Sequence, residues 1–189
     1  MALRRIPLLG VLMLAFVASI CGAALAAKNY PDRVRDVEGG EGPDIASVTL
    51  SNTASTLTFR VRFVSAPPLL VNTGKKWVDM LLIGVDVPPF GPKPSSPGGE
   101  WPGADYALGT HGPSGIGRLV RLGRKHATPI RIELVTSGRT VSLTVPRRAL
   151  GSPRRLTFSI AAAREGSSAA TDGGFDLAPQ NGTFRYELS

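Results

Sequence analysis

Cysteine and histidine are scarce in this chain of 189 residues, which contains one cysteine and two histidines. A single cysteine excludes a framework of internal disulfides, and so few cysteines and histidines exclude a zinc site built from these residues. Long helical patterns are also missing, since the chain carries 22 glycines and 16 prolines. That many helix breakers between short apolar segments favours strands joined by turns over a helical bundle.

The charge balance is basic, with 22 lysines and arginines against 14 aspartates and glutamates. The densest basic cluster consists of Arg147, Arg148, Arg154 and Arg155. A basic face attracts anionic polymers by nonspecific electrostatics. Arginine outnumbers lysine by 17 to 5, however, and a GC-rich coding sequence gives the same skew. We therefore interpret most of the surplus as a solvated surface, with acidic polysaccharide or cell-surface anions preferred over nucleic acid as partners.

The first 26 residues have the three parts of a secretory signal peptide. Arg4 and Arg5 precede an apolar run over 6–20, and small residues surround the Ala24–Ala26 cleavage signal. The run is short for a membrane span, which needs about 20 apolar residues. We expect cleavage before Ala27, a secreted bacterial protein and no membrane span in the mature chain.

Cys21 raises the alternative of a lipid anchor. Lipid attachment favours leucine three residues before the cysteine and a small residue directly before it. Ala18 and Ile20 occupy those two positions, although Gly22 after the cysteine fits the pattern. We therefore treat lipidation as the minority alternative to release from the cell.

The mature chain reads as a leader followed by one β domain. Residues 27–43 are polar and contain glycine, which predicts a flexible leader, and 44–189 are expected to form one domain. Residues 57–63 alternate strictly between apolar and polar, as a half-buried strand does. Two further alternating runs, 130–134 and 141–145, flank Ser137-Gly138 and predict a hairpin. About eight or nine such segments predict an antiparallel all-β sandwich, jelly-roll-like or immunoglobulin-like.

Several short phrases of the chain occur in a familiar order. They are Gly42–Ile45 with Val48–Asn52 and Leu57–Val61, then Gly84–Val87 with Gly103–Tyr106, then Asp176–Phe184 with Tyr186. This order resembles secreted bacterial β-sandwich domains related to the DOMON domain and to family-nine carbohydrate-binding modules, over about residues 42–188. The resemblance implies a non-catalytic jelly roll. Relatives bind sugars or haem, but no histidine here has a clear place as a haem ligand.

The irregular loop over 88–103 is the expected location of a ligand site, because long loops in compact domains often carry function. Trp101 lies there without any strand pattern that demands an apolar side chain, and an exposed ring stacks well on a sugar face. We predict ligand contacts from Trp101, Tyr106, Asp105 and Glu100. The alternative is that Trp101 folds back over the edge of the sandwich.

Asp86, Glu100 and Asp105 are the candidate metal ligands, and calcium is the ion that such oxygens favour. In the family pattern an Asp-x-Asp follows the central strand, whereas here Val87 and Pro88 follow Asp86. Nothing marks these acids as a catalytic pair, so we predict no enzyme and no cofactor besides calcium. The predicted function is a secreted carbohydrate-binding module. The alternatives are a structural or protein-interaction module of the cell envelope and, less favoured, a hydrolase.

Overall fold

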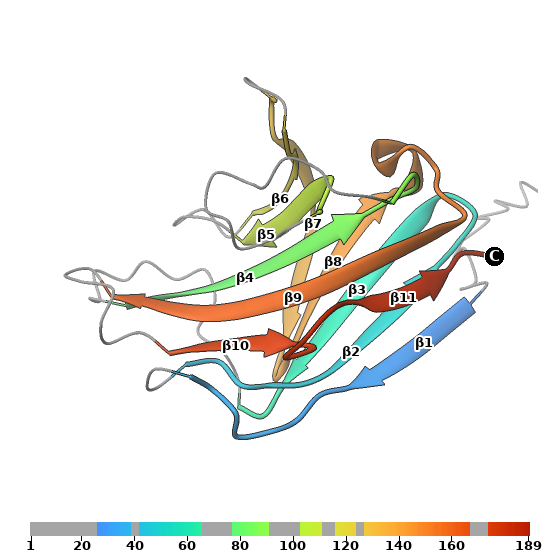
Figure 1. Ribbon diagram of the computed structural model, residues 1–189. Helices are drawn as coiled ribbons and strands as arrows, with labels where there is room; N and C mark the ends of the chain where they lie inside the picture. The colour runs from blue at the N-terminus through green and yellow to red at the C-terminus, as the bar shows by residue number, and fades with distance from the viewer. Residues whose placement is uncertain are drawn as a thin grey trace, which may run out of the picture.

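The computed structural model describes residues 26–38, 42–65, 77–90, 103–110, 116–123, 127–166 and 174–189. Nearly all of its regular structure is β, which confirms the predicted fold class (Figure 1). The described strands are β1 (Ala26–Pro31), β2 (Ile45–Asn52), β3 (Thr56–Phe63), β4 (Trp77–Asp86), β5 (Tyr106–Thr110), β6 (Gly117–Arg121), β7 (Ile130–Ser137), β8 (Thr140–Pro146), β9 (Arg155–Gly166), β10 (Phe175–Ala178) and β11 (Phe184–Glu187).

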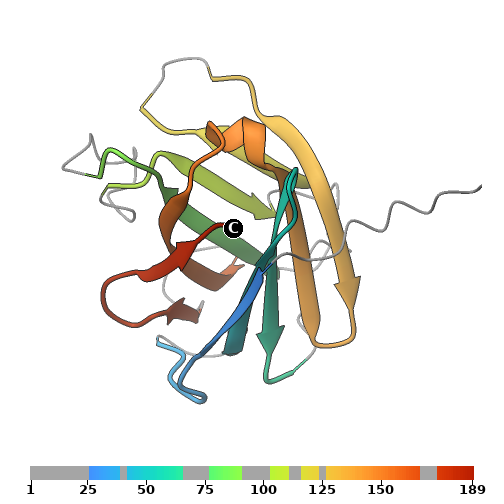
Figure 2. The ribbon, with the colours of Figure 1, turned by 90° about the vertical axis from the view of Figure 1, so that its right-hand side faces the viewer.

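The strands form one antiparallel sheet in the order β1-β2-β3-β8-β7-β6-β5-β4-β9-β10, with β11 also paired to β9. Strands β6 and β7 pair over a short stretch only, from Gly117–Leu119 to Ile130–Ile132. The first and last strands of the sheet approach each other, so the sheet forms a nearly closed barrel (Figure 2). At the closing edge the Tyr30 hydroxyl of β1 donates a hydrogen bond to the Arg185 carbonyl of β11. Tyr186 of β11 donates to Asn52 Oδ1 of β2 at 2.8 Å.

Alternating side chains fill the interior, as the sequence pattern predicts. On β3 the apolar residues Leu57 to Phe63 are buried at every second position, and Arg60 and Arg62 face solvent. The same alternation holds on β8 and β9. Phe158 of β9 lies at the centre of an aromatic cluster, with ring centroids 5.3 Å from Tyr30 and 5.4 Å from Phe59. Apolar burial from both halves of the sheet therefore supplies one common core.

The described residues include two strands that the sequence pattern did not indicate, so this part of the chain has 11 strands instead of the eight or nine predicted. One of these two additions corrects the predicted flexible leader. Within 27–43, residues 27–31 belong to β1, which pairs with β2 along its whole length. Tyr30 anchors this strand because its ring is buried in the core. The other addition is the short β10, paired with the second half of β9.

One short 3-10 helix, η1 (Arg147–Leu150), follows β8 in the described residues. Leu150 is its buried residue, and Gly151 ends it in the left-handed conformation that glycine adopts without strain. Within the described residues, no helix has the length and apolar character needed to cross a membrane.

Candidate functional site

A cavity of about 660 Å³ opens where β4 ends, β5 begins, β6 ends and β9 begins, beside η1. Its described lining consists of Val87, Pro88, Tyr106, Arg121, Leu150, Gly151, Pro153, Arg154 and Arg155. The volume falls in the range of small-molecule sites, roughly 300–1,000 Å³. These lining residues include three arginines and no carboxylate, so an anion entering the cavity gains favourable electrostatic energy.

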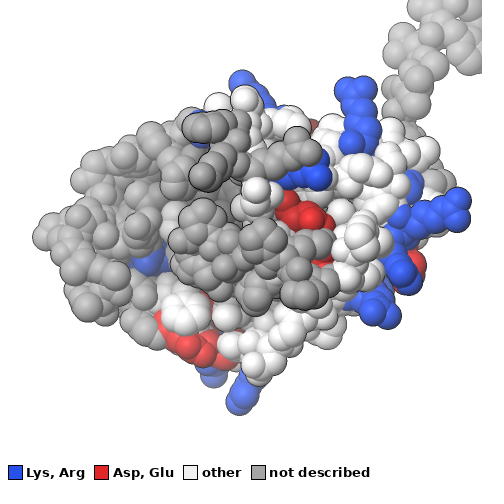
Figure 3. Space-filling model, turned by 45° about the horizontal axis from the view of Figure 1, so that its top comes forward, with Lys and Arg blue, Asp and Glu red and all other residues white. Residues whose placement is uncertain are grey.

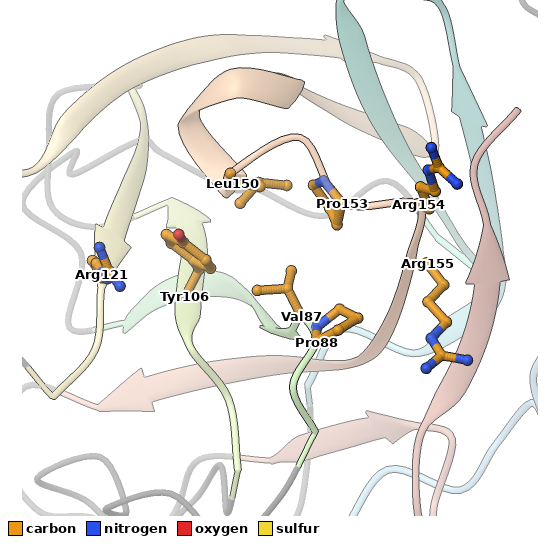
Figure 4. Close-up of a pocket in the computed structure, with 9 residues that line it drawn as sticks. Val87, Pro88, Tyr106, Arg121, Leu150, Pro153, Arg154 and Arg155 are labelled. Carbon is orange, nitrogen blue, oxygen red and sulfur yellow. The ribbon is translucent and has the colours of Figure 1, made fainter.

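The cavity combines an apolar interior with a basic rim. Figure 4 shows Tyr106 and Leu150 beside the open space, with Arg121 on one side and Arg155 on the other. Tyr106 is only 7% exposed, and its ring carries the Arg121 guanidinium 5.9 Å from the ring centroid. The Arg155 guanidinium lies 5.4 Å from the Phe90 ring. Aromatic faces of this kind orient the arginines, whose planar forks suit carboxylate, sulfate or phosphate groups.

Asp105 does not belong to the described lining of this cavity, but it holds the backbone of two lining residues, Val87 and Tyr106. Its carboxylate Oδ2 accepts the Val87 N–H at 2.9 Å. Its backbone N–H donates to the Val85 carbonyl at 2.9 Å, and its carbonyl accepts the Leu122 N–H at 2.7 Å. Asp105 thereby ties the end of β4 to the start of β5 and the end of β6. These bonds fix the backbone on either side of Tyr106.

The basic cluster predicted from the sequence serves two purposes. Arg147 ties the C-terminus to the barrel, because its guanidinium donates to the Thr53 and Ser189 carbonyls at 3.2 Å each. Arg154 and Arg155 are exposed at the rim of the cavity. On the described part of the face in Figure 3, basic side chains project at several separate places. The cavity, where arginines join an apolar wall, is therefore a better defined site than the general basic surface.

The predicted ligand contacts have different outcomes. Trp101 and Glu100 lie outside the described residues, so their roles stay predictions. Tyr106 lines the arginine cavity, whereas Asp86 lines a second cavity of about 400 Å³ between β4, β9 and the turn after β10. The pleat of the chain explains this separation, because Asp86 and Val87 are neighbours that face opposite sides. Tyr106 and Asp86 therefore do not line the same cavity.

The candidate calcium ligands also stay a prediction, since Glu100 is outside the described residues. The described residues contain a different group of carboxylates that could hold a metal ion. Asp36, Asp44 and Asp176 each offer an oxygen, and these oxygens lie within 4.8 Å of one another. Asp32 adds a fourth carboxylate that influences the same group electrostatically.

Sequence reasoning missed both groupings for the same reason. Arg121 is separated by 33 positions from the Arg154-Arg155 pair, and Asp176 by 132 positions from Asp44. Only the pair Arg154-Arg155 was visible as a local signal. The aspartates gave no such signal, because Asp32 and Asp36 lie in the presumed leader and Asp44 directly follows it.

The comparisons with known proteins give no further assignment: no family model, no curated protein and no solved structure matches this chain. The resemblance to DOMON-related and family-nine carbohydrate-binding domains therefore stays a prediction.

Proposed function

We propose that this protein is a secreted, non-catalytic binding module that holds acidic carbohydrate in the arginine-lined cavity. The proposal rests on one observation: a single cavity is lined both by apolar and aromatic side chains and by three arginines. A uronate or sulfated sugar offers the complementary surfaces, namely a ring face with C–H groups and a planar or tetrahedral anion. The ring packs on the edge of Tyr106 and on the exposed Pro88, and the anion pairs with the guanidinium groups.

Arginine is well suited to this task because it stays charged at every physiological pH and presents a rigid fork of donors. The three guanidinium groups belong to residues at the rim: Arg155 begins β9, Arg154 directly precedes it, and Arg121 ends β6. With the charges at the rim, a polysaccharide can lie across the opening of the cavity while one of its sugar units enters it. Neutral sugars would gain the ring contact without the charged hydrogen bonds, each of which contributes about 1.5–3 kcal/mol.

Affinity electrophoresis of the purified mature chain tests the proposal. We expect polygalacturonate in the gel to retard the protein and dextran to leave its migration unchanged. Arg121→Ala and Arg155→Ala should each weaken the retardation about tenfold, the loss of one charged hydrogen bond. Arg60→Ala removes the same charge from the exposed face of β3 and serves as the matched control.

Three results would overturn the proposal. Equal retardation by dextran would show that the anion is not recognised. An equal loss in the Arg60→Ala control would show attraction to the whole basic surface. Release of reducing ends from the polymer would show turnover and favour a hydrolase.

We also propose that residues 1–26 direct export and are then removed. The predicted cleavage point follows Ala26, which is the first residue of β1, so removal leaves most of that strand intact. Expression in a bacterial host followed by N-terminal sequencing of the secreted chain tests this. We expect Ala27 as the first residue. A chain that starts at Met1, or one that carries lipid on Cys21, would contradict it.

A further inference from the structure

Four of the eight aspartates of the chain gather at the end of the barrel away from the arginine cavity. Asp32, Asp36 and Asp44 belong to the connection between β1 and β2, and Asp176 is the second residue of β10. Asp176 pairs with Ala162, seven residues along β9 from Arg155. At about 3.3 Å per residue this places the aspartates about 23 Å from the start of β9.

The backbone brings the two segments together. Glu38 and Phe175 exchange N–H to carbonyl hydrogen bonds of 2.8 and 2.9 Å, which dock the connection onto the start of β10. Gly42 packs against the Gly174 carbonyl so closely that a Cβ there would lie 2.6 Å from the oxygen. The connection is therefore fitted to β10.

Three of these carboxylates are held in the same way. In each, Oδ2 accepts one hydrogen bond from the protein: Asp36 from Gln180 Nε2 at 2.9 Å, Asp44 from the Arg35 N–H at 2.8 Å, and Asp176 from the Ile45 N–H at 2.6 Å. In each, the second oxygen, Oδ1, is buried and has no hydrogen-bond partner. Asp32 Oδ2 is also buried without a partner. The protein thus orients the carboxylates and leaves one oxygen of each available.

Asp176 is the most informative member, because only 1% of its surface is exposed. A buried carboxylate oxygen without a donor is costly, and the neighbouring carboxylates add repulsion. Burial, followed by these neighbours, raises the pKa of Asp176 to about 7, against the opposing hydrogen bond from Ile45. The same two causes raise the pKa of Asp32 to about 6. A cation among the free oxygens would relieve both costs.

We propose that Asp36, Asp44 and Asp176, assisted by Asp32, bind one calcium ion. Calcium–oxygen distances are about 2.3–2.6 Å, so two ligands of one ion at about 2.4 Å lie at most about 4.8 Å apart. The oxygens of Asp36, Asp44 and Asp176 meet this limit. Several carboxylates, three of them on the β1–β2 connection, suit calcium, whereas magnesium usually keeps several waters and takes one or two carboxylates. The bound ion would fasten the β1–β2 connection to β10.

Titration of the chelator-treated full mature chain with calcium chloride tests the site by calorimetry and thermal unfolding at pH 8. We expect one ion per chain and a rise of about 5 °C in the unfolding midpoint in 5 mM calcium, the size given by a dissociation constant near 0.1 mM. Asp176→Asn keeps the acceptor for the Ile45 N–H and removes the charge. It should weaken calcium binding at least tenfold, as should Asp36→Asn.

Glu133→Gln, an exposed carboxylate on β7, is the matched control and should bind calcium as the parent does. Asp176→Asn should also raise the unfolding midpoint of the calcium-free chain, because it removes a repelled buried charge, and that rise shows that the variant folds. Absence of any calcium response in the parent chain would overturn the proposal. So would unchanged binding by both aspartate variants, an equal loss in Glu133→Gln, or an equal response to magnesium chloride.

Discussion

The arginine cavity and the aspartate cluster place like charges together under opposite conditions. Arg121, Arg154 and Arg155 are exposed, so water screens their mutual repulsion and they cost the fold little. The carboxylate of Asp176 is buried among other acids, where repulsion is stronger and water is missing. The difference shows that repulsion between like charges costs little free energy at an exposed rim and much more in the buried interior.

Both ends depend on one core, and Phe158→Ala should therefore weaken both. Phe158 is 1% exposed and contacts the rings of Tyr30, Phe59 and Phe184. We expect a loss of about 3–5 kcal/mol in the free energy of unfolding, measured by urea denaturation. Phe175→Ala, a phenylalanine that is 39% exposed, should cost far less and is the control. Separate unfolding transitions for the two ends would contradict a common core.

The aspartate end should make the calcium-free protein less stable as the pH rises. The unfolded pKa of Asp176 is near 3.8 and the folded value is about 7, so the folded state binds more protons between these values. Stability therefore falls from about pH 4 to pH 7, by on the order of 2–4 kcal/mol. Urea denaturation at pH 4.5 and pH 8 with a chelator measures this loss. Asp176→Asn should remove most of it, and rising stability over this range would refute the assignment.

Gly42→Ala should disturb the aspartate end alone. Its Cβ would meet the Gly174 carbonyl oxygen at 2.6 Å, so the connection must shift away from β10. We expect a loss of about 1–3 kcal/mol in unfolding free energy and weaker calcium binding, both measured on the same preparation. Gly138→Ala has open space for its Cβ but a φ of 55°, so it should cost about 1–2 kcal/mol without changing calcium affinity. Equal calcium affinity in both variants would show that the position of the β1–β2 connection does not affect the aspartate cluster.

Arg155→Ala should change the stability least of all. The side chain is exposed and its guanidinium contacts the ring of Phe90, so we expect a change within about 0.5 kcal/mol in the free energy of unfolding. The same substitution should weaken the retardation by polygalacturonate about tenfold, because one charged hydrogen bond is lost. Thermal unfolding and affinity electrophoresis of one preparation check both statements. A stability loss as large as that of Gly42→Ala would show that the rim arginines are structural.

Much of the fold was predictable because strand alternation is a local property. Alternation predicts which side chains face inward in three runs, 57–63, 130–134 and 141–145. The structure confirms these predictions apart from Ile130, which is 48% exposed. The two strands beyond the predicted number lack this signal. β1 buries only Tyr30 among its six residues, and β10 buries Asp176, a polar residue in an inward position.

The candidate sites were less predictable. The sequence indicated Tyr106 and the Arg154-Arg155 pair, but it gave no reason to add Arg121 to them. It also drew attention to Asp86 and Asp105, while the structure gathers other aspartates. Asp105 has a role in the backbone between Val85 and Leu122 that no spacing rule reveals.

The antiparallel β structure of this chain follows from its local sequence pattern, because the two-residue period and the frequent glycines and prolines act over a few neighbouring positions. Which charged groups meet depends instead on how distant strands pair. The energy of a charge depends on its distance from other charges and on its burial, and both are set by pairing between strands far apart in the chain. For that reason Asp176, unremarkable in the sequence, becomes the centre of the proposed calcium site once β10 pairs with β9 and Ile45 approaches it.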